Sequence, residues 1–113
     1  MRRTTALLDS LDARGVLGNT LVVICSDHGE HLGEHGLASH GGSRYRSVLH
    51  VPLVMALPGR VPAGRRESAV VSLRDVARTV LDLAGMPPTL PGSSLGALWQ
   101  VSGAPVSPGS SPA

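Results

Sequence analysis

The chain has 113 residues, of which 42% are hydrophobic and 16% charged, a composition typical of one small soluble globular domain. The net charge is only +2, and the ten basic residues form no run with interleaved aromatic residues, which argues against a nucleic-acid-binding protein. No apolar stretch approaches the roughly 20 residues of a membrane span, and Asp9 and Asp12 interrupt the start where a signal peptide would be apolar. As written, the sequence therefore predicts a cytoplasmic protein without membrane association.

The first half of the chain predicts a helix, a strand and a loop. Residues 4–14 are predicted to form an amphipathic helix that stops at Gly15, because leucines recur at helical spacing. Residues 19–26 (NTLVVICS) are uncharged and rich in β-branched side chains, which indicates a buried strand with Cys25 as a small buried residue. The glycine-rich residues 29–43 are predicted to form a long polar loop.

Two further strands are predicted in the second half. Residues 50–57 (HVPLVMAL) form the first, with Pro52 at its start or on an edge, because proline has no N–H to donate to a sheet. Residues 69–73 (AVVSL) form a short further strand. With helices on either side, this order indicates the α/β class. The strands need neighbours to cover their edges and apolar faces, so we expect the chain alone to be marginally stable.

A second helix is predicted to begin at Ser72, which acts as an N-cap with Asp75 three residues further on, and to end at Gly85. Its apolar side comprises Val76, Val80, Leu81 and Leu83. One more helical turn is expected within residues 90–100. The Ser, Pro, Gly and Ala of residues 101–113 predict a disordered tail, so residues 1–100 form the one expected domain.

The candidate chemistry lies directly after the first strand. Asp27 and His28 follow its carboxyl end, where ligands gather in open α/β sheets, and a carboxylate beside an imidazole suits a divalent cation. The alternative is a polar loop that contains histidines by chance. A second metal pattern, H-x-x-E-H from His31 to His35, is typical of inverted zinc peptidases, but that chemistry needs a rigid helix and glycines surround the motif.

The stretch TLVVICSDHGEHLGEHGLASHGGSRYRSVLHVPLVM closely resembles the sulfatases of the alkaline phosphatase superfamily. Their typical pattern is a buried strand, S-D-H-G-E-x-L-G-E-H-G, a G-H-G-like turn and V-P-L, followed later by a helix of the form D-L-A-P-T-L-L-D-L-A-G. The resemblance covers about residues 4–88. It implies part of an alkaline-phosphatase-like sandwich, that is, a piece of a larger mixed sheet flanked by helices.

The resemblance implies roles for individual residues. Asp27 and His28 match two ligands of the catalytic divalent ion, with calcium expected first and manganese or magnesium as alternatives. His40 matches the position that contacts the oxyanion of the sulfate or phosphate ester. His50 is expected to be structural. A polar rim or a second shell around the site is expected for Glu30, His31, Glu34 and His35.

The family's nucleophile motif, C/S-x-P-x-R, does not occur in these 113 residues, and Cys25 is followed by SDHG. The resemblance therefore implies the C-terminal part of the catalytic domain of a metal-dependent sulfuric ester hydrolase, inactive on its own. One alternative is a phosphodiesterase or phosphonate hydrolase of the same superfamily. Another is a non-catalytic metal- or anion-binding remnant. In the intact enzyme, the expected partner is a sulfate-ester or phosphate-ester small molecule.

Overall fold

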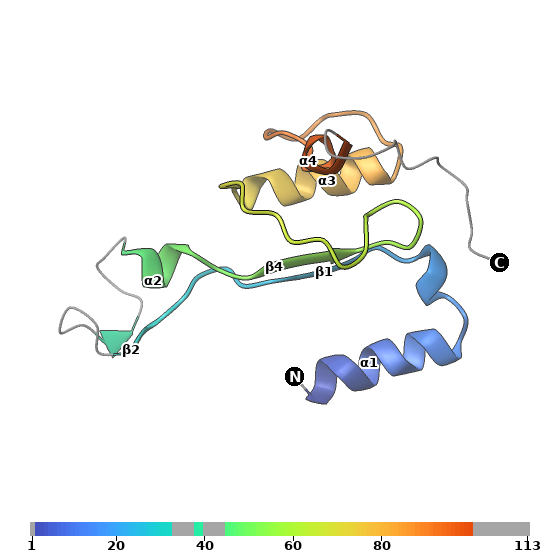
Figure 1. The fold of residues 1–113 in the computed structure, drawn as a ribbon, viewed down its shortest axis with the longest axis horizontal. Helices are drawn as coiled ribbons and strands as arrows, with labels where there is room; N and C mark the ends of the chain where they lie inside the picture. The colour runs from blue at the N-terminus through green and yellow to red at the C-terminus, as the bar shows by residue number, and fades with distance from the viewer. Residues whose placement is uncertain (1, 33–37, 40–44, 101–113) are drawn as a thin grey trace. The chain divides into compact units, whose positions relative to one another are not determined.

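The computed structural model describes residues 2–32, 38–39 and 45–100 (Figure 1). It divides into two compact units, one of Met1–Val22 with Ala56–Ala113 and one of Val23–Met55. The described elements are α1 (Arg2–Ala13), a 3-10 helix η1 (Leu17–Asn19), β1 (Val22–Cys25), β2 (His31–Leu32), β3 (Ala38–Ser39), α2 (Arg46–Leu49), β4 (Leu53–Ala56), α3 (Arg74–Leu83) and α4 (Gly96–Gln100).

The mixture of helices and strands confirms the predicted α/β class. The helix expected over residues 4–14 is α1, and the chain leaves it through Gly15, whose φ of 69° is the left-handed conformation that glycine tolerates. Within the described ranges, no helix is both long and apolar enough to cross a membrane. The expected tail, residues 101–113, lies outside the described residues.

The two strands on either side of the candidate site pair with each other. β1 lies within the predicted residues 19–26 and β4 within 50–57, and the two are neighbours in a two-stranded sheet. Pro52 comes immediately before β4, where its missing N–H removes nothing from the sheet. The alternation of half-buried and exposed residues along β4 is the period-2 pattern of a strand with one covered face.

The prediction that the first strand is buried is wrong for this chain. Ile24 is 40% exposed, and Cys25 is exposed rather than a small buried residue. The apolar side chain of Val54 on the partner strand is 55% exposed. The residue types of this segment predict a strand correctly. They do not predict its burial, because burial depends on the elements that pack on the sheet, and two strands make only a narrow one.

The loop predicted over residues 29–43 contains a short antiparallel pair of strands. His31 in β2 faces Ser39 in β3, and Leu32 faces Ala38. A two-residue pair is below the length at which alternating hydrophobicity is readable from sequence, which explains why the glycine-rich composition predicted only a loop.

The short strand predicted over residues 69–73 is not observed. Side chains take the backbone donors that a neighbouring strand would otherwise bind. The N–H of Ala69 donates to Glu67 Oε1 over 3.2 Å, and that of Ser72 donates to Asp75 Oδ2 over 3.3 Å. Such local side-chain bonds compete with strand pairing, and the segment stays irregular and exposed.

Ser72 and Asp75 cap the start of α3 as predicted, but Ser72 lies one residue before the N-cap position and not at it. The residue before the helix is Leu73, which makes no side-chain cap bond. Ser72 Oγ instead accepts the N–H of Arg74 over 3.2 Å, and Asp75 Oδ2 accepts the N–H of Ser72. This reciprocal arrangement is a capping box opened by a serine one residue further out. The helix ends as predicted, with Gly85 at a φ of 69°.

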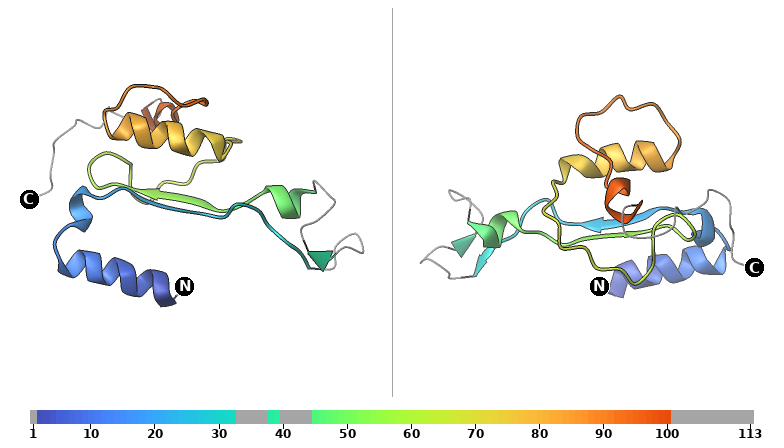
Figure 2. Two further views of the ribbon diagram at one scale, coloured as in Figure 1. Left: turned by 180° about the vertical axis from the view of Figure 1, so that it is seen from behind. Right: turned by 45° about the horizontal axis from the view of Figure 1, so that its top comes forward.

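A loop and the short helix α4, which lies alongside α3 (Figure 1, Figure 2), are fastened to α3 by polar side chains. Thr79 is fully buried; its hydroxyl donates to the Asp75 carbonyl over 2.7 Å and accepts the N–H of Leu95 over 2.8 Å. One turn further along, Ser94 Oγ donates to Asp82 Oδ2 over 2.5 Å. The expected extra helical turn within residues 90–100 is therefore present as α4 and is held at its beginning.

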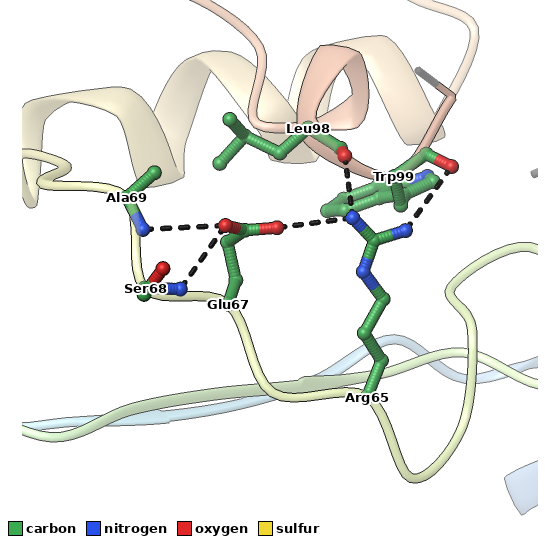
Figure 3. A network of polar contacts seen from close by, with 6 residues as sticks. All are labelled: Arg65, Glu67, Ser68, Ala69, Leu98 and Trp99. Carbon is green, nitrogen blue, oxygen red and sulfur yellow. Dashed lines mark hydrogen bonds and ion pairs between the residues drawn. The ribbon is translucent and has the colours of Figure 1, made fainter. Parts of the chain in front are cut away.

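The end of α4 is held by an arginine from the preceding connection (Figure 3). The Arg65 guanidinium donates to the carbonyls of Leu98, over 2.8 Å, and Trp99, over 3.5 Å, and it pairs with Glu67 over 3.0 Å. Carbonyls in the last turn of a helix lack intrahelical partners, and a cation there also opposes the negative end of the helix dipole. Arg65 thus joins residues 65–67 to α4.

The unit that contains α3 and α4 should lose stability in acid. The Arg65 hydrogen bond holds the pKa of Glu67 below its ordinary value, and the N–H groups of Ser93 and Ser72 do the same for the pKa of Asp75. A lowered folded-state pKa means stability that is present above the unfolded pKa, near 4, and is lost as pH falls through the folded value. Urea titrations from pH 6 to pH 2.5 check this expectation. Glu67→Gln and Asp75→Asn should each make the free energy of unfolding less dependent on pH below about pH 4.5. The same pH dependence in both variants as in the wild type would contradict this expectation.

Candidate functional site

The turn after β1 is organised by its own side chains. Ser26 Oγ donates to the carbonyl of His28 over 2.7 Å, and Asp27 Oδ1 accepts the N–H of His28 over 3.0 Å. Short polar side chains that bind the backbone two residues or fewer away fix such turns. The turn places Asp27 and His28 next to each other, at the end of β1.

The two candidate ligand side chains converge. His28 Nε2 lies 3.7 Å from Asp27 Oδ2, while His28 Nδ1 lies 2.9 Å from the carbonyl of Gly29. A carbonyl only accepts hydrogen bonds, so Nδ1 carries the proton in this contact, and in the neutral form of the ring the lone pair lies at Nε2. The Asp27 side chain is 88% exposed. The arrangement thus brings two electron-pair donors together at an accessible position, which favours a cation.

The separation of these atoms fits one shared ion. Calcium binds its ligands at roughly 2.3–2.6 Å, so two of its ligands lie up to about 5 Å apart, and the observed 3.7 Å falls within that limit. A histidine whose other nitrogen donates to a carbonyl is the usual form of a metal-bound histidine. Among the residues that the structure describes, no group of three or more His, Cys, Asp and Glu side chains gathers around them. The ligand roles of Asp27 and His28 remain predictions.

Gly29 is needed for a close approach to α2. Its N–H donates to the carbonyl of Val48 over 2.7 Å, and a Cβ added at this position would overlap the carbonyl of Ser47. Glycine fits this position because it carries no side chain where two backbone segments touch.

His31 is buried, with only 2% of its surface exposed. Its Nδ1 is hydrogen-bonded to Ser47 Oγ over 2.9 Å, and its ring meets that of Tyr45 edge to face at 5.8 Å. Its place in β2 also contradicts the zinc-peptidase pattern, which requires a helix at this position. No sequence signal indicated Tyr45 or Ser47 as partners of His31, because both lie far along the chain from it, Ser47 by 16 positions.

The remaining candidates contribute little to the described site. Glu30 is exposed next to the turn. His50 is also exposed, and its backbone N–H donates to the Arg46 carbonyl at the end of α2, so the structural role expected of its side chain stays a prediction. Three predicted residues, His40, Glu34 and His35, lie outside the described residues. The oxyanion role of His40 therefore stays a prediction.

A strand that ends in a D-H-G turn and returns through V-P-L is the pattern from which the family resemblance was drawn. The family model described as Sulfatase matches residues 4–86. The chain belongs to the sulfatase family. The match confirms the resemblance and covers most of α1, the β1–β4 sheet, the candidate site and α3.

Several curated sulfatases are similar to the chain over much of its length. Arylsulfatase K of Mus musculus is 44% identical over 82 residues, 71% of this chain and 14% of that protein, and the Homo sapiens protein is 46% identical over 72 residues, 64% and 13%. N-acetylglucosamine-6-O-sulfatase of Bacteroides thetaiotaomicron is 38% identical over 91 residues, 79% of this chain and 17% of that protein. The stretch that aligns is thus less than one fifth of the length of each of these sulfatases.

Proposed function

We propose that this chain is part of the catalytic domain of a metal-dependent sulfuric ester hydrolase, to which it contributes two metal ligands and an oxyanion contact. Asp27 and His28 hold the divalent ion, for which calcium is the first candidate, and His40 contacts the sulfate group. Membership of the sulfatase family supports the class of reaction. The observation that carries the assignment of the site is the 3.7 Å approach of His28 Nε2 to Asp27 Oδ2.

The fold of the larger protein is part of this proposal. The β1–β4 pair belongs to the mixed sheet of an alkaline-phosphatase-like sandwich, in which further strands pair with its edges and helices cover its faces. The exposed apolar side chains of Ile24 and Val54 support this, because such residues are covered in a sheet that has its full set of strands and helices.

The residues of the chain have separate tasks in the proposed reaction. The carboxylate of Asp27 supplies negative charge to the site, and His28 supplies a neutral nitrogen whose orientation the Gly29 carbonyl fixes. His40, when protonated, donates to a sulfate oxygen and opposes the charge that develops there. The bound ion would supply Lewis acidity, lowering the pKa of a nucleophile and neutralising developing charge.

The chain alone should bind a divalent ion weakly and hydrolyse nothing. Two ligands do not complete a coordination shell, and these 113 residues contain no C/S-x-P-x-R nucleophile motif. Assays with an aryl sulfate and a phosphate diester, in millimolar Ca²⁺ or Mn²⁺, should give no turnover above the uncatalysed rate. Turnover that depends on metal and disappears in Asp27→Ala would contradict the proposal of an incomplete site.

Each metal ligand can be tested by removing it. Asp27→Ala and His28→Ala should each weaken Ca²⁺ binding, measured by calorimetry, at least about tenfold, because half of the described ligand set is lost. Asp12→Ala, an exposed carboxylate in α1, is the matched control and should leave the affinity unchanged. Equal Ca²⁺ affinities in the wild type, the two ligand variants and the control would show that Asp27 and His28 do not bind the ion. Sulfate and phosphate esters are distinguished by assaying both with any longer form of the protein that carries a nucleophile.

A further inference from the structure

His31 occupies the one position that the sulfatase pattern S-D-H-G-E-x-L-G-E-H-G leaves open, so the pattern requires no histidine there, and the sequence predicts only a place in the polar surroundings of the site. It is nevertheless one of the two polar side chains that are fully buried among the described residues. Burying an imidazole is favourable only when its nitrogens find partners, and Ser47 provides one of them at 2.9 Å. A buried histidine three residues after His28 therefore needs an explanation.

We infer that His31 is a positioning residue that holds the Asp27–His28 turn in the geometry needed for the ion; this inference rests on the proposed function. Its side chain fastens β2 to Ser47 of α2, and the edge-to-face contact with Tyr45 fixes the plane of the ring.

The connection to the site runs through three consecutive residues. Gly29 is attached to α2 by its N–H, which donates to Val48, and His31 is attached to the neighbouring Ser47. Residues 29–31 are therefore held at both ends against the same helix. The carbonyl of Gly29 accepts the Nδ1–H of His28 and so directs Nε2 toward Asp27. Loosening His31 frees one end of this segment and with it the carbonyl that orients the ligand ring.

Partners that orient a metal-bound histidine typically change the metal affinity about tenfold or more when they are removed. A merely structural role predicts something different. In that case, loss of the His31 contact lowers the melting temperature, but the folded molecules bind the ion as before.

The test compares the whole 113-residue chain with His31→Leu, His31→Asn and Ser47→Ala. The probe is Mn²⁺ alone, titrated while the His28 ring signals are followed by NMR, and the exchange rate of the Gly29 amide is measured without metal. His31→Leu and Ser47→Ala should raise the Mn²⁺ Kd about tenfold and speed Gly29 exchange. His31→Asn keeps a polar group near the position of Nδ1 and should recover most of both properties.

The outcomes separate this inference from the proposed function. Wild-type Kd and wild-type Gly29 exchange in Ser47→Ala, which removes a single oxygen, overturn the inference even if His31→Leu does not fold. If Mn²⁺ leaves the wild-type His28 signals unchanged, the proposed metal site fails. In that event, the inference on His31 is still tested without metal, by comparing Gly29 amide exchange and the ring nitrogen chemical shifts of His28 between the wild type and the variants. Unchanged values in the variants would show that His31 does not orient the turn.

Discussion

Replacing Gly29 with alanine is expected to lower the free energy of unfolding of the Val23–Met55 unit by about 3 kcal/mol, the upper end of the range for overpacking. The new methyl group would overlap the carbonyl of Ser47, and that obstacle is backbone rather than a flexible side chain. Relief requires moving α2 away, which breaks the bond from the residue 29 N–H to the Val48 carbonyl. The orienting carbonyl for His28 moves with it, so Mn²⁺ affinity should fall as well.

Urea denaturation followed at Tyr45, the only tyrosine and a member of the same unit, measures the effect. Gly18→Ala is the matched control, because a Cβ at Gly18 meets nothing within 4 Å and its φ is not positive. It should change the free energy of unfolding by less than about 0.5 kcal/mol. Equal effects of the two substitutions would show that Gly29 and α2 do not approach as described.

Replacing Thr79 with valine is expected to destabilise the packing of α4 on α3 by about 2 kcal/mol. The two side chains have nearly the same shape, but valine cannot accept the N–H of Leu95, which is buried. A buried donor left without a partner costs about 1–3 kcal/mol. The bond from the Thr79 hydroxyl to the Asp75 carbonyl is lost as well.

Denaturation followed at Trp99, the only tryptophan and a residue of α4, reports this change. Thr79→Ser keeps the hydroxyl and loses one buried methyl group, so it should cost about 1 kcal/mol or less and leave Leu95 amide exchange slow. Thr79→Val should speed that exchange at least tenfold. Slow exchange at Leu95 in the valine variant would contradict the hydrogen bond from which the expectation is drawn.

Elements that depend on local chemistry were predictable from the sequence. α3 has apolar residues at helical spacing, Ser72 and Asp75 at its start and Gly85 at its end, and these signals act within a few residues of one another. β1 and β4 were found for a similar reason, since each is a short apolar run next to turn residues.

Features that depend on distant residues were not predictable. The burial of β1 depends on what lies across the sheet, and composition carries no such information. The irregular residues 69–73 are an exception, because the cause is local: they have strand-forming side chains, but the carboxylates of Glu67 and Asp75 accept the N–H groups of Ala69 and Ser72. The close approach that requires glycine at position 29 is made by α2, which follows much later in the chain. The contact of His31 with Ser47 follows no sequence periodicity at all.

A Mn²⁺ titration of the chain labelled with ¹⁵N in its histidine rings tests directly whether Asp27 and His28 share one divalent ion. The His28 signals should broaden first and at Nε2 rather than Nδ1, since Nδ1–H donates to the Gly29 carbonyl. Asp27→Asn should abolish the effect at the same metal concentration. Broadening that begins at another histidine, or that is unchanged in Asp27→Asn, would contradict the shared site.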